Sequence, residues 1–321
     1  MSVVIPVLND ARRLDECLRS LGENDCALEV LVIDNGSTDT SVAVARARGA
    51  TVVVRPHGSV GALRNEGARM ASASYVAFVD ADHRVGRGWA EAALEVLRAP
   101  AVGAAGAPYQ SEGNTWVQRT YDGLRRHRPG RQTVSWLGSG NMIVRRAAFE
   151  AIGGFDERIH TCEDVDLCRR LRAAGWVIVS DSSLVSTHSG DPATLRGVFL
   201  GELWRGRDNL FVSVRRPWDA RAIASALVPA MSLSLAAASL VAAGGAFFSA
   251  SAASVALLGV PVLLRTCQIC AGRNSWNPVA VGQGIAVSAC FEAGRALALV
   301  ARAGHRRRRG GGADQSVGAA G

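Results

Sequence analysis

The first 80 residues alternate between short apolar runs and segments with the apolar spacing of a helix. The apolar runs are continuous, as in SVVIPV and YVAFV, which is typical of strands covered on both faces of a parallel sheet. The intervening helical segments fall at 11–20, 41–48 and 60–70. We therefore expect a doubly wound α/β domain with a mostly parallel sheet between two layers of helices.

The turns after the first two predicted strands are polar. The first lacks the G-x-G-x-x-G pattern that lets a backbone approach a pyrophosphate, which argues against a dinucleotide-binding oxidoreductase. The second reads VIDNGSTD and puts Asp34 and Asn35 at the carboxyl end of a strand. Their side chains could hold a base or ribose there, although they could equally form only a well-capped turn.

Two carboxylates, Asp80 and Asp82, follow the later apolar strand and are separated by one residue. Acids this close repel each other unless a cation lies between them, and a divalent ion with oxygen ligands is the usual partner. Parallel strands end at the same edge of a sheet, so these acids and the turn after Asp34 should face one crevice. Together they predict a site for a nucleotide diphosphate and a divalent cation.

Three further acids, Glu163, Asp164 and Asp166, occur within four positions at the start of a helix that should run to about residue 174. Acids in a first turn suit the dipole of any helix, so a purely structural role is the plain alternative. Three in four positions exceed that need and favour a catalytic role.

Four ordered blocks resemble the family 2 glycosyltransferases with the GT-A fold, over residues 2 to about 212. The blocks read VVIPVLND, VIDNGSTD, GALRNEGARMASASYVAFVDADH and GSGNMIVRRAAFEAIGGFDERIHTCEDVDLCRRLRAAGW. Their order and spacing make the resemblance specific. It implies a Rossmann-like GT-A domain over 1–212 that transfers a sugar from a nucleotide-diphosphate donor.

The resemblance also implies roles for single residues. The nucleotide-sugar site would include Pro6, Asn9, Asp34, Asn35, Arg64, Asn65 and Asp80. The family's D-x-D pattern falls on Asp80 and Asp82, of which Asp82 would be the more direct ligand of Mn²⁺ or Mg²⁺. His83 stands where the family often has a third acid, which is a departure from the pattern.

The acceptor side would depend on the later acids. Asp164 would accept the proton of the acceptor hydroxyl, and Glu163 would orient it or contact the acceptor. Asp166 would hold the arginines that follow it. His188, in a loop after the strand predicted at 176–180, would contact the metal or the diphosphate, although a histidine in a loop is often only solvated.

Two arginines, Arg205 and Arg207, precede the C-terminal apolar region, and their charge suits a phosphate of the donor or acceptor. Processive polysaccharide synthases of the family have Q-x-x-R-W near this point. This chain has Glu202 and the reversed order Trp204-Arg205, which argues against a processive polymerase.

Residues 222–264 contain no charged side chain. As a helix this stretch would be about 64 Å long at about 1.5 Å per residue, which allows two crossings of a hydrocarbon core of about 30 Å. We therefore expect a membrane hairpin, with a buried hairpin in a soluble domain as the alternative. The apolar segment 277–301 carries Glu292 and Arg295, which could pair with each other. It should lie at the interface or against the hairpin rather than form a third span, so we expect two spans with both termini in the cytoplasm.

The net charge of +8 is concentrated around these segments, in a basic linker at 213–221, after residue 264 and at 306–309. The positive-inside rule puts such clusters in the cytoplasm, and no nucleic-acid motif accompanies them. A strand at the very start of the sequence leaves no room for a signal peptide, so we expect the catalytic domain to face the cytoplasm. The region 222–303 should be the membrane region and 304–321 a disordered, Gly-rich tail.

Seven cysteines in that compartment should be reduced, and the pair Cys267 and Cys270 has no partner pair to make a zinc site. We predict an inverting, metal-dependent transferase that moves one sugar from a nucleotide-diphosphate donor to a cell-envelope glycan or polyprenyl-linked lipid, at the cytoplasmic membrane face. Two alternatives remain open. One is a nucleotidyltransferase, whose Gly-rich signature is replaced here by Asn9-Asp10, and the other is a catalytically silent membrane scaffold.

Overall fold

The chain divides into two compact units, which are built from interleaved segments. The computed structural model describes residues 1–125, 129–215, 220, 223–224, 227–229, 231, 234 and 248–310. The first unit is Met1–Asn114 with Arg125–Asp191, and the second is Thr115–Leu124 with Pro192–Gly321. The contacts thus group residues 192–212 with the second unit, whereas the sequence placed a boundary at 212.

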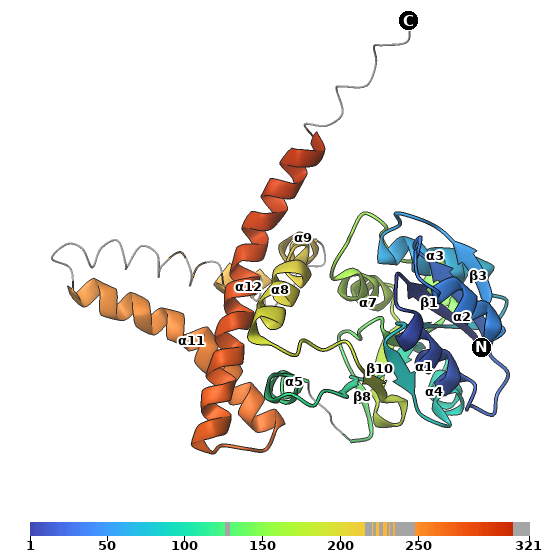
Figure 1. The fold of residues 1–321 in the computed structure, drawn as a ribbon, viewed down its shortest axis with the longest axis horizontal. Helices are drawn as coiled ribbons and strands as arrows, with labels where there is room; N and C mark the ends of the chain where they lie inside the picture. The colour runs from blue at the N-terminus through green and yellow to red at the C-terminus, as the bar shows by residue number, and fades with distance from the viewer. Residues whose placement is uncertain are drawn as a thin grey trace, which may run out of the picture. The chain divides into compact units, whose positions relative to one another are not determined.

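The first unit contains the alternating strands and helices expected from the sequence (Figure 1). Its strands are β1 (Ser2–Val7), β2 (Glu29–Asp34), β3 (Thr51–Val54), β4 (Tyr75–Val79), β5 (His83–Val85), β6 (Val102–Gly106), β7 (Gln110–Ser111), β8 (Arg131–Thr133), β9 (Asn141–Arg145), β10 (Val177–Asp181) and β11 (Ser186–His188). Its helices are α1 (Ala11–Leu21), α2 (Ser41–Ala47), α3 (Val60–Met70), α4 (Trp89–Leu97), α6 (Arg146–Ala151) and α7 (Glu163–Ala173), with a 3-10 turn at Ser182–Leu184.

An eight-stranded sheet with the order β3-β2-β1-β4-β9-β6-β10-β8 forms the centre of this unit. The pairs β1–β2, β1–β4, β2–β3 and β6–β10 are parallel. Strand β9 lies antiparallel between β4 and β6, and β8 pairs antiparallel with β10. The prediction of an α/β fold with a mostly parallel sheet is therefore confirmed.

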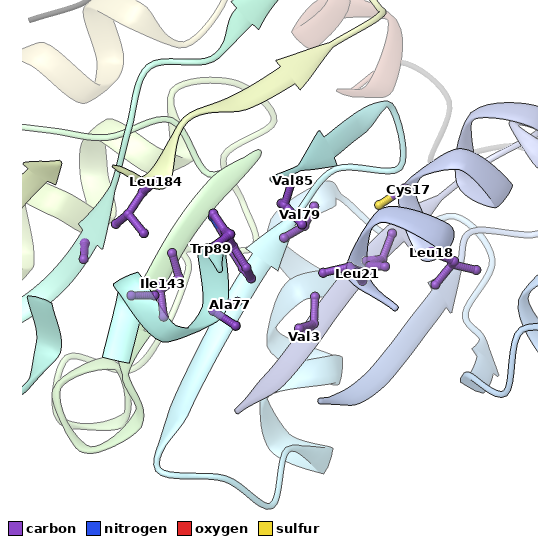
Figure 2. Close-up of a cluster of buried hydrophobic side chains, with 14 of the residues drawn as sticks. Val3, Cys17, Leu18, Leu21, Ala77, Val79, Val85, Trp89, Ile143 and Leu184 are labelled. Atoms are coloured by element: carbon purple, nitrogen blue, oxygen red, sulfur yellow. The ribbon is translucent and has the colours of Figure 1, made fainter. Parts of the chain in front are cut away.

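The continuously apolar strands are buried on both faces of this sheet. Along β1, Val3 and Ile5 join the core beneath α1 and α4, whereas Val4 joins the core on the opposite face with α3, α6 and α7. Figure 2 shows the first of these cores, with Trp89 of α4 and Leu21 of α1 against strand residues. Full burial of each such side chain is worth about 1.5–3 kcal/mol, so the sheet ends are held by a rigid frame.

A smaller three-stranded sheet, ordered β5-β11-β7, follows the carboxyl end of β4. Strand β11 is antiparallel to β5 and parallel to β7. In this register His188 of β11 lies directly opposite His83 of β5. Directly opposed residues project to the same face of a sheet, so the two imidazoles are brought together by the strand pairing.

The second unit is helical in the described residues, with α5 (Trp116–Asp122), α8 (Leu195–Arg205), α9 (Asn209–Ser213), α11 (Phe248–Gly272) and α12 (Pro278–Gly310). Helix α12 packs against α8 and α11 (Figure 1). Gly294 permits the close crossing with α8, because a methyl group there would lie 2.6 Å from the carbonyl oxygen of Phe199. The apolar core of this unit includes Val117, Tyr121, Val198, Ile269, Val287 and Phe291.

Charged side chains inside this helical unit are paired between helices. Glu202 of α8 is 1% exposed and accepts hydrogen bonds from Tyr121 Oη at 2.7 Å and Arg295 Nε at 2.6 Å. Arg265 Nε donates to Glu292 Oε1 at 2.7 Å. The expected pairing of Glu292 with Arg295 is corrected by these contacts, since each of the two finds its partner on another helix.

Among the helices that the structure describes, none has the length and apolar character needed to cross a membrane. Of the hairpin predicted at 222–264, residues 248–264 lie in α11, and most of the remainder falls outside the described residues. The segment 277–301 forms most of α12. The described helices therefore give the predicted membrane spans no support.

The predicted disordered tail is partly helical. Residues 304–310 continue α12, whereas 311–321 lie outside the described residues. Arginine has a high helix propensity, which is consistent with a helix that extends through the run at 306–309.

Candidate active site

A buried arginine joins the two groups of acids that the sequence singled out. Arg64 of α3 is 2% exposed and donates from Nη2 to Asp80 Oδ1 and from Nη1 to Glu163 Oε1, both at 2.7 Å. Burial acts to lower the pKa of Arg64, but the two carboxylates outweigh it and raise the pKa. The D-x-D acids after β4 and the acids at the start of α7 therefore belong to one site.

Asp164 stands beside this arrangement in the first turn of α7. Burial, and then the charge of Glu163, raise the pKa of Asp164 to about 7. Its Oδ1 accepts the adjacent backbone N–H of Val165 at 2.7 Å. A carboxyl with a pKa near neutrality and a second oxygen available is suited to accept a proton from a bound hydroxyl.

Asp166 has the structural role that the resemblance implied. It is 1% exposed and pairs with Arg169 at 3.2 Å and Arg170 at 2.8 Å on the same helix. The prediction that it ties down the following arginines is confirmed.

The partly buried Asp82 contacts His188. His188 Nε2 lies 3.1 Å from Asp82 Oδ2, and its Nδ1 lies 3.2 Å from Asp191 Oδ1. Burial acts to lower the pKa of His188, but the hydrogen bonds to both carboxylates outweigh it and raise the pKa to about 9. Burial acts to raise the pKa of Asp82, but the hydrogen bond from His188 and nearby positive charge outweigh it and lower the pKa.

His83 completes this cluster from the neighbouring strand. Its Nδ1 is 2.9 Å from Ser186 Oγ, and its ring centroid is 4.9 Å from that of His188. Burial lowers the pKa of His83 to about 4, so its imidazole is neutral at pH 7. Tyr109 packs against both rings, at 5.0 Å from His83 and 4.4 Å from His188.

The residues present fit a divalent cation. Ligand atoms of Asp82, His83 and His188 all lie within 4.8 Å of one another. A carboxylate with imidazole nitrogens suits Mn²⁺ and related ions. Of the three ligands predicted, Asp82 and His188 belong to this group, whereas Asp80 is held by Arg64 and is not part of it.

Two glycines leave room at this cluster. A methyl group on Gly190 would overlap Asp82 Oδ2 and lie 2.8 Å from His188 Nε2. A methyl group on Gly140 would lie 2.7 Å from Asp80 Oδ2 and 2.9 Å from His83 Nε2. The backbone at Gly140 and Gly190 thus lies so close to these four polar side chains that a larger residue at either position would clash with them.

The predicted nucleoside residues lie at the carboxyl ends of β1 and β2. Asp34 is 1% exposed; its Oδ2 accepts the N–H groups of Gly36 and Ser37, and its buried Oδ1 has no hydrogen-bond partner among the described residues. An unsatisfied buried carboxylate oxygen is costly without a ligand, which supports a nucleoside hydroxyl or base there. Pro6 is buried in β1.

The predicted amide side chains mainly connect loops. Asn9 has φ 52° and joins the turn after β2 through Ser37 and Thr38. The carboxamide of Asn35 pairs with the backbone of Gly58 in both directions, at 2.9 and 3.3 Å.

Of three more predicted residues, two have side-chain partners in the structure. Asn65 donates to Phe155 O at 2.9 Å and to Glu157 Oε1 at 3.0 Å. Arg205 belongs to the second unit and pairs with Glu202 at 3.2 Å. Arg207 is half-buried in the same unit, with an Nε that has no hydrogen-bond partner among the described residues.

Sequence reasoning missed several residues of the site. Asp191 and Arg125 form an ion pair that supports His188, with Arg125 Nη1 at 2.9 Å from Asp191 Oδ2. Ser139 Oγ donates to Glu163 Oε1 at 3.2 Å. The spacing His188-x-x-Asp191 in THSGD could have indicated the aspartate, but no local signal marks Arg125 or Ser139.

Comparisons with known proteins find similarity to glycosyltransferases. Residues 2–153 match the family model for glycosyl transferase family 2. Over 190 residues the chain is 35% identical to the pre-mycofactocin glycosyltransferase of Mycobacterium tuberculosis, covering 54% of this chain and 39% of that protein. Over 52 residues it is 50% identical to the N-acetylglucosaminyl-diphospho-decaprenol L-rhamnosyltransferase of the same organism, covering 16% and 17%.

A solved structure resembles most of the chain. The mannosyltransferase PcManGT from Pyrobaculum calidifontis, in complex with GDP-Man and Mn²⁺, matches with a TM-score of 0.61 and 18% identity, over 90% of this chain and 86% of that one. At this identity the likeness establishes the fold.

The sheet order and the likeness to this solved structure define an α/β domain of the GT-A-like fold class. Within that class, residues 2–153 are similar to glycosyl transferase family 2. The chain spans about two fifths of the length of the first curated relative, at 39%.

Proposed function

We propose that the protein is an inverting, metal-dependent glycosyltransferase that moves one sugar from a nucleotide-diphosphate donor to an acceptor hydroxyl. The acceptor would be a cell-envelope glycan or a polyprenyl-linked lipid, reached at the cytoplasmic face of the membrane. The relative that acts on an N-acetylglucosaminyl-diphospho-decaprenol supports this acceptor class through its name.

The shared ion pairs of Arg64 are the observation that carries this proposal. One guanidinium contacts Asp80 of the D-x-D motif and Glu163 of the α7 motif, each at 2.7 Å. A donor diphosphate near Asp80 and an acceptor hydroxyl near Glu163 would thus lie on either side of the buried guanidinium of Arg64. Such positioning is what a transfer between two bound substrates requires.

The chemistry then follows from Asp164. Its carboxylate takes the proton from the acceptor hydroxyl as that oxygen forms a bond to the anomeric carbon. The bond from the anomeric carbon to the diphosphate breaks on the opposite face, and the nucleoside diphosphate leaves with the electron pair. One displacement of this kind inverts the configuration at the anomeric carbon.

Asp82 and His188, with His83, would hold a Mn²⁺ or Mg²⁺ ion. Such an ion, when bound, stabilises the negative charge that develops on the diphosphate leaving group. Asp34 would bind the nucleoside through its buried Oδ1, which lacks a partner among the described residues.

Two substitutions test the division of labour between the two groups of acids. Asp82→Ala should abolish both turnover and the effect of Mn²⁺ on donor binding. Asp164→Asn should bind donor normally but transfer sugar about 10²–10⁴-fold more slowly, because general-base catalysis is lost. Thermal shift with a panel of nucleotide sugars, with and without Mn²⁺, identifies the donor, and product formation gives the rates.

Asp15→Asn is a matched control, since Asp15 forms an ion pair with Arg48 on the surface of the first unit. It should leave both donor binding and turnover unchanged. Near-normal activity of Asp82→Ala in a chelator, or loss of donor affinity with an unchanged rate in Asp164→Asn, would show that the roles are misassigned.

A further inference from the structure

A cavity of about 390 Å³ opens in the second unit between α5, the loop after α11 and the start of α12. Its lining includes Arg119 of α5, Arg273 and Ser275 of the loop, and Gln283 of α12. Among the described residues that line it, none is acidic. We name this feature the arginine cavity.

The guanidinium of Arg273 is held in place by uncharged partners. Its Nη1 donates to Thr120 Oγ1 and to Gln283 Oε1, both at 3.1 Å. These contacts fix the group without compensating its charge. Two guanidiniums in one concave site suit a phosphate, which accepts several N–H groups at once.

The N-terminus of α12 does not supply the anion-binding groups of the arginine cavity. Asn277 Oδ1 already accepts the backbone N–H of Ala280 at 2.8 Å, so the helix start is capped by its own chain. The arginines are the groups that could bind an anion in this cavity.

Large apolar side chains are exposed around the same cavity. Trp276 is 58% exposed and Val279, which lines the cavity, is 68% exposed. Trp116, three residues before Arg119 on the same helix, is 37% exposed. Tryptophan beside basic residues is typical of protein surfaces at the boundary between lipid headgroups and acyl chains.

We propose that this face docks on an anionic lipid surface, with a phospholipid phosphate in the arginine cavity and Trp276 and Val279 at the acyl boundary. Charge complementarity selects this occupant, because the cavity combines two cations with exposed apolar groups. The inference goes beyond the proposed transferase activity, since docking needs no donor, no acceptor and no turnover.

Co-sedimentation of the full chain with vesicles tests the proposal. Wild-type protein should bind vesicles that contain phosphatidylglycerol and should bind pure phosphatidylcholine vesicles much less. The variant Arg119→Gln/Arg273→Gln should lose about 30-fold in partitioning to anionic vesicles, the effect of two arginines near an anionic surface. Equal binding of wild type to both vesicle types would overturn the proposal.

A matched control removes the same charge elsewhere. Arg87 and Arg98 have side chains that are 82% and 79% exposed in the first unit, and Arg87→Gln/Arg98→Gln should bind like wild type. An equal loss of vesicle binding in this control would show that net charge drives the binding. It would overturn the arginine cavity as the lipid-binding site. Trp276→Ser is a second probe in case the double variant misfolds. It should weaken vesicle binding without changing the melting temperature. Unchanged vesicle binding would count against docking.

Inorganic phosphate distinguishes a lipid from a soluble ligand. Stabilisation by millimolar phosphate in the wild type, without vesicle binding, would overturn the lipid surface as the occupant. Binding to anionic vesicles that is retained in millimolar phosphate supports it.

Discussion

Asp164 acts as a base only when it is ionised, and its pKa of about 7 makes the ionised fraction depend on pH in the neutral range. We expect kcat at saturating donor and acceptor to rise about tenfold per pH unit well below pH 7 and to level off above about pH 8. The pH–rate profile measures this. The residual rate of Asp164→Asn should lack that rise, and the same rise in this variant would assign the titration to another group.

The same shift has a consequence for stability. Because the folded-state pKa of Asp164 is raised above its ordinary 3.8, ionisation is easier in the unfolded chain. The contribution of the Asp164 carboxyl to the free energy of unfolding is therefore full below about pH 4. It is lost as the pH rises through about 7. Asp164→Asn should remove this loss, so urea unfolding should find the variant more stable than wild type at pH 8 and less different at pH 5.

Arg64 compensates two carboxylates from a position that is 2% exposed. Removing one partner of a buried ion pair leaves charge uncompensated, at a cost of about 3–5 kcal/mol. We expect Arg64→Gln to lower the free energy of unfolding by that amount and to reduce sugar transfer sharply. Denaturant unfolding checks the first effect.

Arg12→Gln is the matched control for Arg64. Arg12 also pairs with a glutamate, Glu16, but its side chain is 79% exposed. An exposed pair is worth about 0–1 kcal/mol, so this variant should stay close to wild type. Equal destabilisation by the two substitutions would contradict the importance of burial.

At the scale of elements, the three-stranded sheet brings His83 and His188 together, and two glycines follow its strands. Gly190 comes after β11 and leaves no room for a methyl group beside Asp82 and His188, whereas a methyl group on Gly86, after β5, would meet nothing within 4 Å. We expect Gly190→Ala to reduce Mn²⁺-dependent turnover about 10–100-fold, as when ligand positioning is lost. Gly86→Ala should retain activity in the same manganese titration, and equal losses would show that the sheet tolerates neither change.

Local patterns predicted most elements of the first unit, because a strand that is buried on both faces has a continuously apolar sequence. The helices at 11–20, 41–48 and 60–70 correspond to α1, α2 and α3. The antiparallel place of β9 between β4 and β6 was not predictable, since strand order depends on partners far away in the chain. The position of His188 was not predictable for the same reason. Its strand pairs with β5, and the contacting residues His83 and Ser186 are 103 positions apart in the sequence.

The candidate site was predicted in its residue types but less well in its contacts. Asp82, Glu163 and Asp164 were found because acids at strand and helix ends have few purely structural reasons to cluster. Arg64 was expected at the nucleotide, yet the structure puts it between two carboxylates. Side-chain partners of this kind are set by tertiary packing, which a motif does not contain.

At the scale of the whole molecule, the second unit needs its C-terminal helices to bury its own core. A form ending at Pro217 would lack α11 and α12, which would expose Tyr121 and Val198 and leave Glu202 without Arg295. We expect this form to have a lower soluble yield and melting temperature than one ending at Gly310. Equal melting temperatures for the two truncated forms would contradict the packing described here.

The interleaving of the two units also has a consequence for synthesis on the ribosome. Helix α5 is made long before α11 and α12, whose Ile269 and Phe291 share its core. With about 150 residues between them and translation at about 5–20 residues per second, α5 waits about 7–30 s for its partners. The first unit is complete once Asp191 has left the ribosome. Nascent chains should therefore pass through a stage in which this unit is folded while the apolar residues of α5 are still exposed. Such an exposed segment is a target for a chaperone.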